Sequence, residues 1–235
     1  MFLVILYVSY VARAGLVVAI DELEGRKNEL TFGSAYHAGR QYFWRLFGFD
    51  ILISLVAIGL LMIMIAPVIL LFIAAGKSPA VLALAILLAI IVFLIFIVVI
   101  IYFGILRLLG SRALVINNLG IRASISYGHQ MIINKKGYSV LAWLVSLLVG
   151  LVYGIALGIA VIIVGLILFA VGYGIYKAAG SVGQVPITVT MIGIFIALLM
   201  FVSGVFTSFI STYWTLTFRA IDYYFKKDKE ISVNP

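Results

Sequence analysis

Two histidines, His37 and His129, are the side chains of this sequence best suited to acid–base or metal chemistry at neutral pH. If the fold brought them together, they would form a metal pair or a catalytic base. Neither has an Asp or Glu at metal-ligand spacing, and the chain has no cysteine, so thiolate metal sites and cysteine nucleophiles are excluded. We therefore interpret both histidines as polar-face residues of surface helices and predict neither a metal ion nor a cofactor.

Arg13 and Asp50 are charged residues placed within or at the edge of apolar sequence. Arg13 lies inside the first apolar run, and an arginine at the centre of a bilayer costs ~2.5–3.5 kcal/mol. Asp50 enters the second apolar run from the same side of the membrane, so we predict an ion pair between the two. Such a pair either locks two helices together, which is the interpretation we favour, or provides charge for a gate or a substrate site.

Gly150, Gly154 and Gly158 follow a strict four-residue step in the fourth apolar run. This spacing places three glycines on one ridge of a helix, where the backbone of another helix is able to approach closely. We predict helix packing within the chain at this ridge. A homo-oligomer or a membrane partner subunit that packs on the ridge is the alternative.

The elements that must position these residues are membrane-spanning helices. The 235 residues are 66% hydrophobic and 10% charged, against roughly 45–50% and 25% in soluble proteins. Five apolar runs are long enough to cross a bilayer, at about residues 1–20, 46–75, 79–106, 138–176 and 187–218. The sequence therefore predicts an all-α integral membrane protein, with a single transmembrane domain over residues 1–235 that forms a bundle of five helices.

Lysine and arginine are distributed unevenly between the connections of these runs. Thirteen lie in the segments 21–45 and 107–137 and in the tail 219–235, whereas only Lys77 and Lys177 lie in the other connections. By the positive-inside rule the tail is cytoplasmic and residue 1 is outside. All three tryptophans also lie near the positive side of the predicted bundle, as an interfacial belt requires. The net charge of +8 is thus explained by topology, and we predict no nucleic-acid partner.

The beginning of the sequence leaves two interpretations open. Met1 is already part of an apolar run and has no basic segment or small-residue cleavage site around it, which is not typical of a signal peptide. Either the protein begins at the outer membrane surface, or an upstream piece with one further span precedes this sequence. The second interpretation gives six spans in place of five.

Two polar segments, 31–45 and 121–136, have related patterns and predict an internal duplication. Each follows a span and has a small residue and a histidine before an aromatic-led new span, at a repeat distance of 92–93 residues. Their apolar residues recur on one helical stripe: Phe32, Ala35, Gly39, Phe43 and Leu46 in the first, and Ile121, Ile125, Gly128 and Ile132 in the second. We predict two cytoplasmic interfacial amphipathic helices, whose basic residues attract anionic lipids.

The layout resembles a group of uncharacterised bacterial and archaeal inner-membrane proteins. This group includes the membrane domain attached to some glycerophosphodiester phosphodiesterases. Loose motifs carry the resemblance: Gly25 with Thr31-Phe32-x-x-Ala35, Ser124-Ile125-x-x-Gly128, and Tyr213 with Arg219-Ala220-x-Asp222-Tyr223. The resemblance implies a multi-pass protein of the prokaryotic plasma membrane whose membrane domain is not itself the catalyst.

Sequences typical of enzymes and pumps are missing from the chain. HExxH, GxSxG and P-loop patterns do not occur, and no Asp, Glu, Lys or His lies deep in the second to fifth runs. Ion-coupled transporters normally need such groups. We predict a non-catalytic membrane protein that serves as an accessory, scaffold or lipid-interacting subunit. A permease or lipid transporter with a cavity between the repeats is the alternative, and a headgroup-directed enzyme using His37 and His129 is a third.

Overall fold

The structure, a computed structural model, describes residues 2–24, 31–76, 78–179 and 184–233. These residues form six α-helices: α1 (Phe2–Glu24), α2 (Phe32–Ala75), α3 (Pro79–Ile116), α4 (Ile121–Asn134), α5 (Lys136–Ala179) and α6 (Gln184–Val233). Five of the six, all except α4, are long and apolar enough to cross a membrane. The all-helical prediction with five spanning helices is therefore confirmed, and the helices fit a multi-pass membrane protein.

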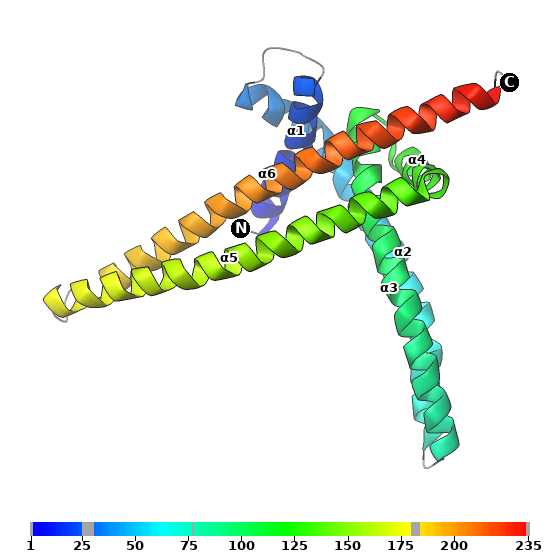
Figure 1. The fold of residues 1–235 in the computed structure, drawn as a ribbon, viewed down its shortest axis with the longest axis horizontal. Helices are drawn as coiled ribbons and strands as arrows, with labels where there is room; N and C mark the ends of the chain where they lie inside the picture. Colours follow the sequence, from blue (N-terminus) through cyan, green and yellow to red (C-terminus); the bar gives the residue numbers. More distant parts are fainter. Residues whose placement is uncertain (1, 25–30, 77, 180–183, 234–235) are drawn as a thin grey trace. The chain divides into compact units, whose positions relative to one another are not determined.

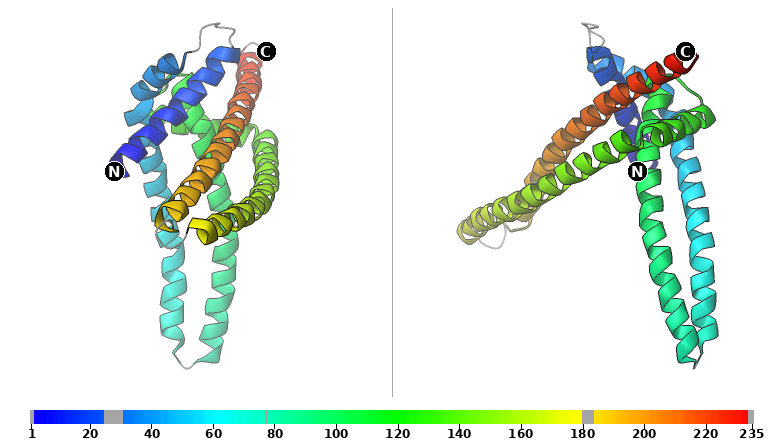
Figure 2. Two further views of the ribbon diagram at one scale, coloured as in Figure 1. Left: turned by 90° about the vertical axis from the view of Figure 1, so that its left-hand side faces the viewer. Right: turned by 45° about the vertical axis from the view of Figure 1, so that its right-hand side comes forward.

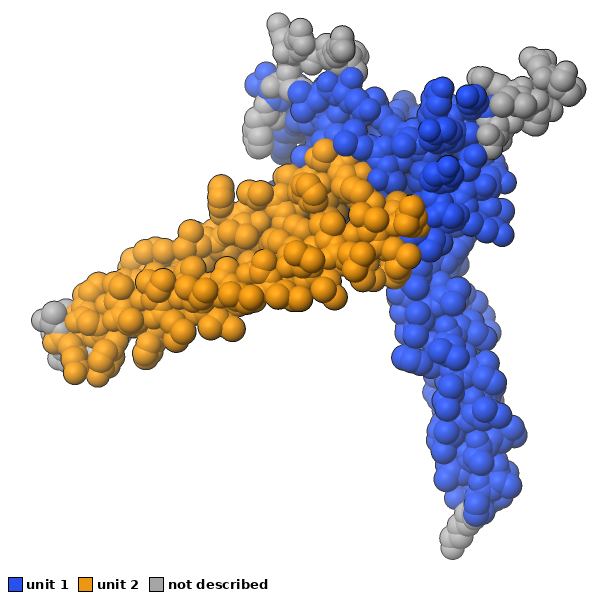
Figure 3. Space-filling model, in the orientation of Figure 1, with its two compact units in different colours: residues 1–140, 214–235 blue, residues 141–213 orange. Residues whose placement is uncertain are grey.

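The chain divides into two compact units (Figure 3). Unit 1 comprises Met1–Val140 and Trp214–Pro235, and unit 2 comprises Leu141–Tyr213. Unit 1 therefore contains α1 to α4 together with the beginning of α5 and the end of α6. Unit 2 contains the remaining parts of α5 and α6.

Within unit 1, α2 and α3 form a long antiparallel hairpin (Figure 1). Gly76 ends α2 with φ of +46°, a backbone conformation that glycine adopts at little cost. Ser78 then caps α3, and Pro79 occupies its first turn, where the missing N–H is not needed. The large side chains along the outer part of this hairpin are exposed, as expected of helices that face lipid.

The buried core of unit 1 lies where the other ends of these helices meet α1, α4 and the last part of α6. Its fully buried side chains include Phe49, Leu109, Met131, Trp214 and Phe218. Trp214 is 1% exposed, so its indole is buried in the protein and does not face lipid.

Glycines allow the closest helix contacts in this core. A Cβ on Gly39 would strike the backbone of Val11 and lie 2.8 Å from the nitrogen of Gly15. A Cβ on Gly128 would lie 3.2 Å from the nitrogen of Gly110. Thus α1 crosses α2, and α3 crosses α4, with backbone against backbone.

Several helix ends differ from the boundaries expected from hydropathy. The span expected at 79–106 belongs to a helix that continues to Ile116. The tail expected at 219–235 is helical as far as Val233. The polar segment 31–45 is not a separate helix, because α2 runs from Phe32 to Ala75 without a break. Hydropathy shows where the apolar part of a helix ends. The helix itself continues beyond that point wherever its backbone hydrogen bonds continue.

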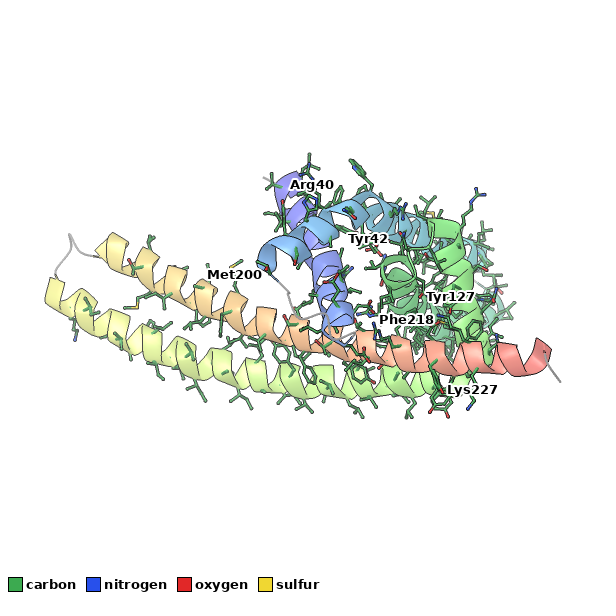
Figure 4. All side chains as sticks on the ribbon, turned by 90° about the horizontal axis from the view of Figure 1, so that it is seen from above. Arg40, Tyr42, Tyr127, Met200, Phe218 and Lys227 are labelled. Carbon is green, nitrogen blue, oxygen red and sulfur yellow. The ribbon has the colours of Figure 1, made fainter. Side chains whose placement is uncertain are left out.

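Unit 2 is a hairpin of two apolar helices that lie side by side in both views of Figure 2. Tyr153 of α5 stacks on Phe206 of α6 with ring centroids 3.5 Å apart, and the hydroxyl of Tyr213 donates to the carbonyl of Ala142. Side chains project outward along both helices (Figure 4). Most large apolar side chains of this hairpin are exposed, which is the arrangement expected of a lipid-facing surface.

Candidate functional site

The polar centre of unit 1 is built around the carboxylate of Asp50. The Asp50 side chain, on α2, is 12% exposed, and its Oδ2 lies 3.5 Å from Nη1 of Arg13 on α1. The structure therefore brings together the two residues that the sequence predicted as an ion pair. The hydroxyl of Tyr10, one turn before Arg13 on α1, donates to the same oxygen at 2.9 Å. The 3.6-residue period of α1 places Tyr10 and Arg13 on one face.

Arg107 is a second arginine at this carboxylate, contributed by α3. Its Nε lies 3.0 Å from Oδ1 of Asp50, and its Nη2 donates to the hydroxyl of Ser54 at 2.6 Å. Asp50 and Ser54 are four residues apart on α2, so one guanidinium reaches both. The side chains of Arg13 and Arg107 are 60% and 42% exposed, respectively. Both side chains are therefore partly exposed, although Nε of Arg107 is buried.

Arg112 lies one and a half turns further along α3 and is far more buried. The residue is 6% exposed, and Nη1 donates to the carbonyl of Leu108 at 2.8 Å. Its Nε has no hydrogen-bond partner, and no carboxylate in the described part of the chain forms an ion pair with it. A buried guanidinium that lacks a counter-ion is costly. Sequence analysis did not single out Arg112, because its position lies beyond the expected end of the third span.

A second ionic cluster joins the end of α6 to the end of α1. Nη2 of Arg219 lies 2.6 Å from Oδ1 of Asp21, and Nη1 lies 3.1 Å from Oε2 of Glu24. Arg219 also donates to the backbone carbonyl of Asp21 at 3.0 Å. One arginine thus binds two carboxylates and a carbonyl at the C-terminal turn of α1, where the helix dipole also favours a cation.

Asp222 carries the contact between α6 and α4. The hydroxyl of Tyr127, on α4, donates to Oδ1 of Asp222, and Nζ of Lys226 lies 2.7 Å from Oδ2. Burial, together with the hydrogen bond and the negative charge of Asp222, raises the pKa of the Tyr127 phenol above its ordinary value. Tyr127 and Phe218, a core residue of α6, are both labelled in Figure 4. The motif residues Arg219 and Asp222 therefore have packing roles within unit 1.

The two histidines are not brought together. His37 is exposed near the beginning of α2, and His129 is exposed on α4. The Nδ1 of His129 shares a hydrogen bond with the hydroxyl of Tyr102. Within the ranges that the structure describes, no group of three His, Asp or Glu side chains is arranged to hold a metal ion. No interaction among the described residues joins the two histidines, and the hydrogen-bond partner of His129 is the phenol of Tyr102.

Within unit 2, the ridge of Gly150, Gly154 and Gly158 does not pack against α6. A Cβ at any of the three would meet no atom within 4 Å. In unit 2, α5 faces α6 through a different side, which includes Tyr153, Leu157 and Val161. Four-residue spacing identifies a ridge of small residues but does not identify which ridge a neighbouring helix uses.

Two apolar grooves lie between α5 and α6. The larger, of about 510 Å³, is lined by residues that include Leu168, Phe169, Met191 and Phe195. The smaller, of about 310 Å³, begins at Tyr153 and shares Phe195 with the first. Their linings are almost entirely apolar, so these grooves do not form the polar path that ion or solute transport requires.

No protein-family model, curated protein or solved structure matches the chain.

Proposed function

We propose that this protein is a non-catalytic integral membrane protein that binds anionic lipids at the cytoplasmic face of a prokaryotic plasma membrane. The observation that carries the proposal is the imbalance of charge at the polar centre of unit 1. One carboxylate, Asp50, serves both Arg13 and Arg107, whereas Arg112 has no acidic partner among the described residues. Phosphate groups of lipids are the anions available in quantity at a membrane surface.

Exposed cations extend this imbalance over the same end of unit 1. They are Arg40, Arg45, Arg122, Lys136, Lys226 and Lys227. Among the acids whose side chains the structure describes, Asp21 and Glu24 bind Arg219, and Asp222 binds Lys226. Each Lys or Arg close to an anionic membrane surface contributes ~1 kcal/mol of attraction. The positive-inside rule places this end in the cytoplasm, with residue 1 outside and the C-terminus inside.

The proposal includes an internal duplication that relates α1–α2 to α3–α4–α5, in a register of 89 residues. The caps of α2 and α4, Thr31 and Gly120, differ by this number, and so do the crossing glycines Gly39 and Gly128. The register of 92–93 residues expected from the motifs does not align these features. In the second copy α4 ends at Asn134, whereas the corresponding part of α2 continues directly into the span.

The geometry favours lipid binding over transport of polar solutes and over an enzyme that uses both histidines. A permease for ions or polar solutes requires a polar cavity, whereas the two grooves between α5 and α6 are apolar. These grooves do not lie between the repeats, and a lipid transporter stays the alternative function. An enzyme that uses both histidines requires them at one site, and no interaction joins His37 to His129. A homo-oligomer or partner subunit that uses the open ridge of Gly150, Gly154 and Gly158 is compatible with lipid binding.

Native mass spectrometry after purification in a mild detergent tests the proposal. We expect phosphatidylglycerol or cardiolipin to remain bound in defined numbers and phosphatidylethanolamine to be lost. An equal retention of zwitterionic and anionic lipids would contradict the proposal. Retention of another protein subunit without lipid would favour the accessory or scaffold role.

A further inference from the structure

We propose that the larger groove between α5 and α6 binds one acyl chain of an anionic phospholipid, and that Lys177 binds the phosphate group of the same lipid. The site lies wholly within unit 2 and shares no residue with the polar centre of unit 1. It belongs to the leaflet next to the connection between α5 and α6, which the positive-inside rule places outside. The inference goes beyond the proposed function and does not depend on lipid binding at the polar centre.

Glycines of α5 leave the space that forms the groove. Gly165 and Gly172 are seven residues apart and therefore share one face of the helix with Phe169, which also lines the groove. A Cβ on Gly165 would meet no atom within 4 Å, and a Cβ on Gly172 would lie 3.6 Å from Cγ of Met191 on α6. The resulting space of about 510 Å³ lies within the range of ~300–1,000 Å³ that is typical of sites for small molecules.

The groove suits an acyl chain in polarity and in length. Leu168 of α5 and Ile192 and Phe195 of α6 contribute to its lining, which is almost entirely apolar. Gly165, at the far end of the groove, lies twelve residues before Lys177, about 18 Å along the helix axis. Half of the hydrocarbon core of a bilayer is about 15 Å thick. An acyl chain whose headgroup lies beside Lys177 is therefore long enough to occupy the groove within one leaflet.

Lys177 gives the occupant its charge. It is the single charged residue among residues 141–213, so unit 2 contains no carboxylate to pair with it. Its Nζ lies 5.2 Å from the centroid of the Tyr173 ring, within the distance of a cation–π contact. Because Tyr173 lines the groove, this contact holds the ammonium at the end of the apolar lining. A lipid phosphate at this point would neutralise the charge through a charge-assisted hydrogen bond.

A lipid fits the groove better than a transmembrane helix does. Helices approach one another closely over ridges of small residues, and the ridge of Gly150, Gly154 and Gly158 contributes to neither groove. Phe169, by contrast, is 73% exposed, and its ring keeps the backbone of another helix away from the groove. The occupant is therefore a thin and flexible chain.

Photolabelling of the full-length protein in nanodiscs tests the site. The probe is phosphatidylglycerol with a diazirine on one acyl chain, and mass spectrometry identifies the labelled peptides. Gly165→Leu fills the groove, and its matched control is Gly154→Leu, the same change in the same helix at a position that lines neither groove. Lys177→Gln removes the charge, and its matched control is Lys227→Gln, which removes another exposed cation.

In the wild type we expect the peptides that contain residues 165–173 and 188–195 to be labelled above the rest of unit 2. Gly165→Leu should reduce this labelling to the level of the rest of unit 2, whereas Gly154→Leu should leave it unchanged. Lys177→Gln should reduce it about fivefold, the factor that one cation near an anionic headgroup supplies. Lys227→Gln should leave it unchanged. Thermal unfolding in the same nanodiscs shows which variants are folded, and the exposed position of Lys177 provides a test that does not alter the packing of α5.

Three results would overturn the proposal. Equal labelling of the groove peptides in the wild type and in folded Gly165→Leu would show that lipid does not enter the groove. Labelling that depends on Gly165 but not on Lys177 would overturn the anionic headgroup. Crosslinks between two protein chains that replace the lipid labels as more copies are placed in each nanodisc would identify a second copy as the occupant.

Native mass spectrometry separates this site from the proposed function, because Lys177→Gln leaves every cation of unit 1 in place. A wild-type protein that retains phosphatidylglycerol while its groove peptides stay unlabelled would overturn the groove site alone. If the wild type is labelled in the groove and Lys177→Gln retains no phosphatidylglycerol, the proposed function fails and the groove site stands.

Discussion

Gly128 of α4 lies directly against the backbone of Gly110 of α3, where an added Cβ would come within 3.2 Å of the Gly110 nitrogen and 3.3 Å of its Cα. Gly15 and Gly39 have the same relationship at the crossing of α1 and α2. The Gly15–Gly39 contact sets how closely α1, which carries Arg13, approaches α2, which carries Asp50.

Substitution of Gly39 by alanine should therefore destabilise the protein. The new Cβ would collide with the backbone carbonyl of Val11, which is unable to move without moving α1. Overpacking of this kind costs about 1–3 kcal/mol. The matched control is Gly59→Ala, also in α2, where a Cβ meets nothing within 4 Å. Thermal unfolding in detergent should show a lower midpoint for the first variant and an unchanged or higher midpoint for the second; equal midpoints would refute the close crossing.

Asp50 should be coupled more strongly to Arg107 than to Arg13. The distance to Arg107 is 3.0 Å with a second contact at Ser54, whereas Arg13 is 3.5 Å away and more exposed. We expect Asp50→Asn to cost about 1–2 kcal/mol, below the value for a fully buried pair because both arginines are partly solvated. Double-mutant cycles with Arg107→Gln and Arg13→Gln measure the two coupling energies. A larger coupling to Arg13 would contradict the geometry.

Stability should fall at alkaline pH through Tyr127. Burial and the carboxylate of Asp222 raise the pKa of the Tyr127 phenol above its ordinary value of 10.0. Since the folded pKa is the higher one, the stabilisation is present below pH ~10 and is lost as the pH rises further. The drop in unfolding temperature between pH 9 and 11 should be larger for the wild type than for Tyr127→Phe. An equal drop in unfolding temperature in both proteins would contradict the raised pKa of the Tyr127 phenol.

The open glycine ridge of α5 should tolerate larger side chains. Replacement of Gly154 by leucine adds a side chain where even a Cβ meets no atom. We expect the free energy of unfolding of the dilute protein to change by no more than about 0.5 kcal/mol. A loss of stability as large as that of Gly39→Ala would show that the ridge packs within the chain. Crosslinking at higher protein concentration would show separately whether the variant alters self-association.

The membrane-spanning helices were predictable because a run of about twenty apolar residues has few other stable locations. The Arg13–Asp50 contact was predictable for a related reason: two opposite charges at the same depth of adjacent helices gain by pairing. Hydropathy does not show where a helix ends, however, so it did not show that Arg107 belongs to the same polar centre. Arg107 was assigned to a loop because hydropathy ends at Leu106, although α3 continues to Ile116.

Tertiary packing decided the features that the sequence did not predict. Tryptophan is typical of the interfacial belt, yet Trp214 is buried in the protein core. Gly39 and Gly128 were expected on the apolar stripes of two amphipathic helices, but their close backbone contacts were not predicted, because a glycine makes such a contact only where a second backbone approaches it. The internal duplication stays a proposal. The N-caps Thr31 and Gly120 and the glycines Gly39 and Gly128 are each 89 residues apart, whereas the partners of these glycines, Gly15 and Gly110, are 95 residues apart.

The central claim is that the polar end of unit 1 faces the cytoplasm, and accessibility of single cysteines tests it most directly. The chain has no cysteine of its own, so single substitutions at Lys27, Lys135, Lys77 and Lys177 need no background removal. When intact cells are treated from outside with an impermeant thiol reagent, only the cysteines at positions 77 and 177 should react. Labelling at Lys27 and Lys135 as rapid as at Lys77 would contradict the account.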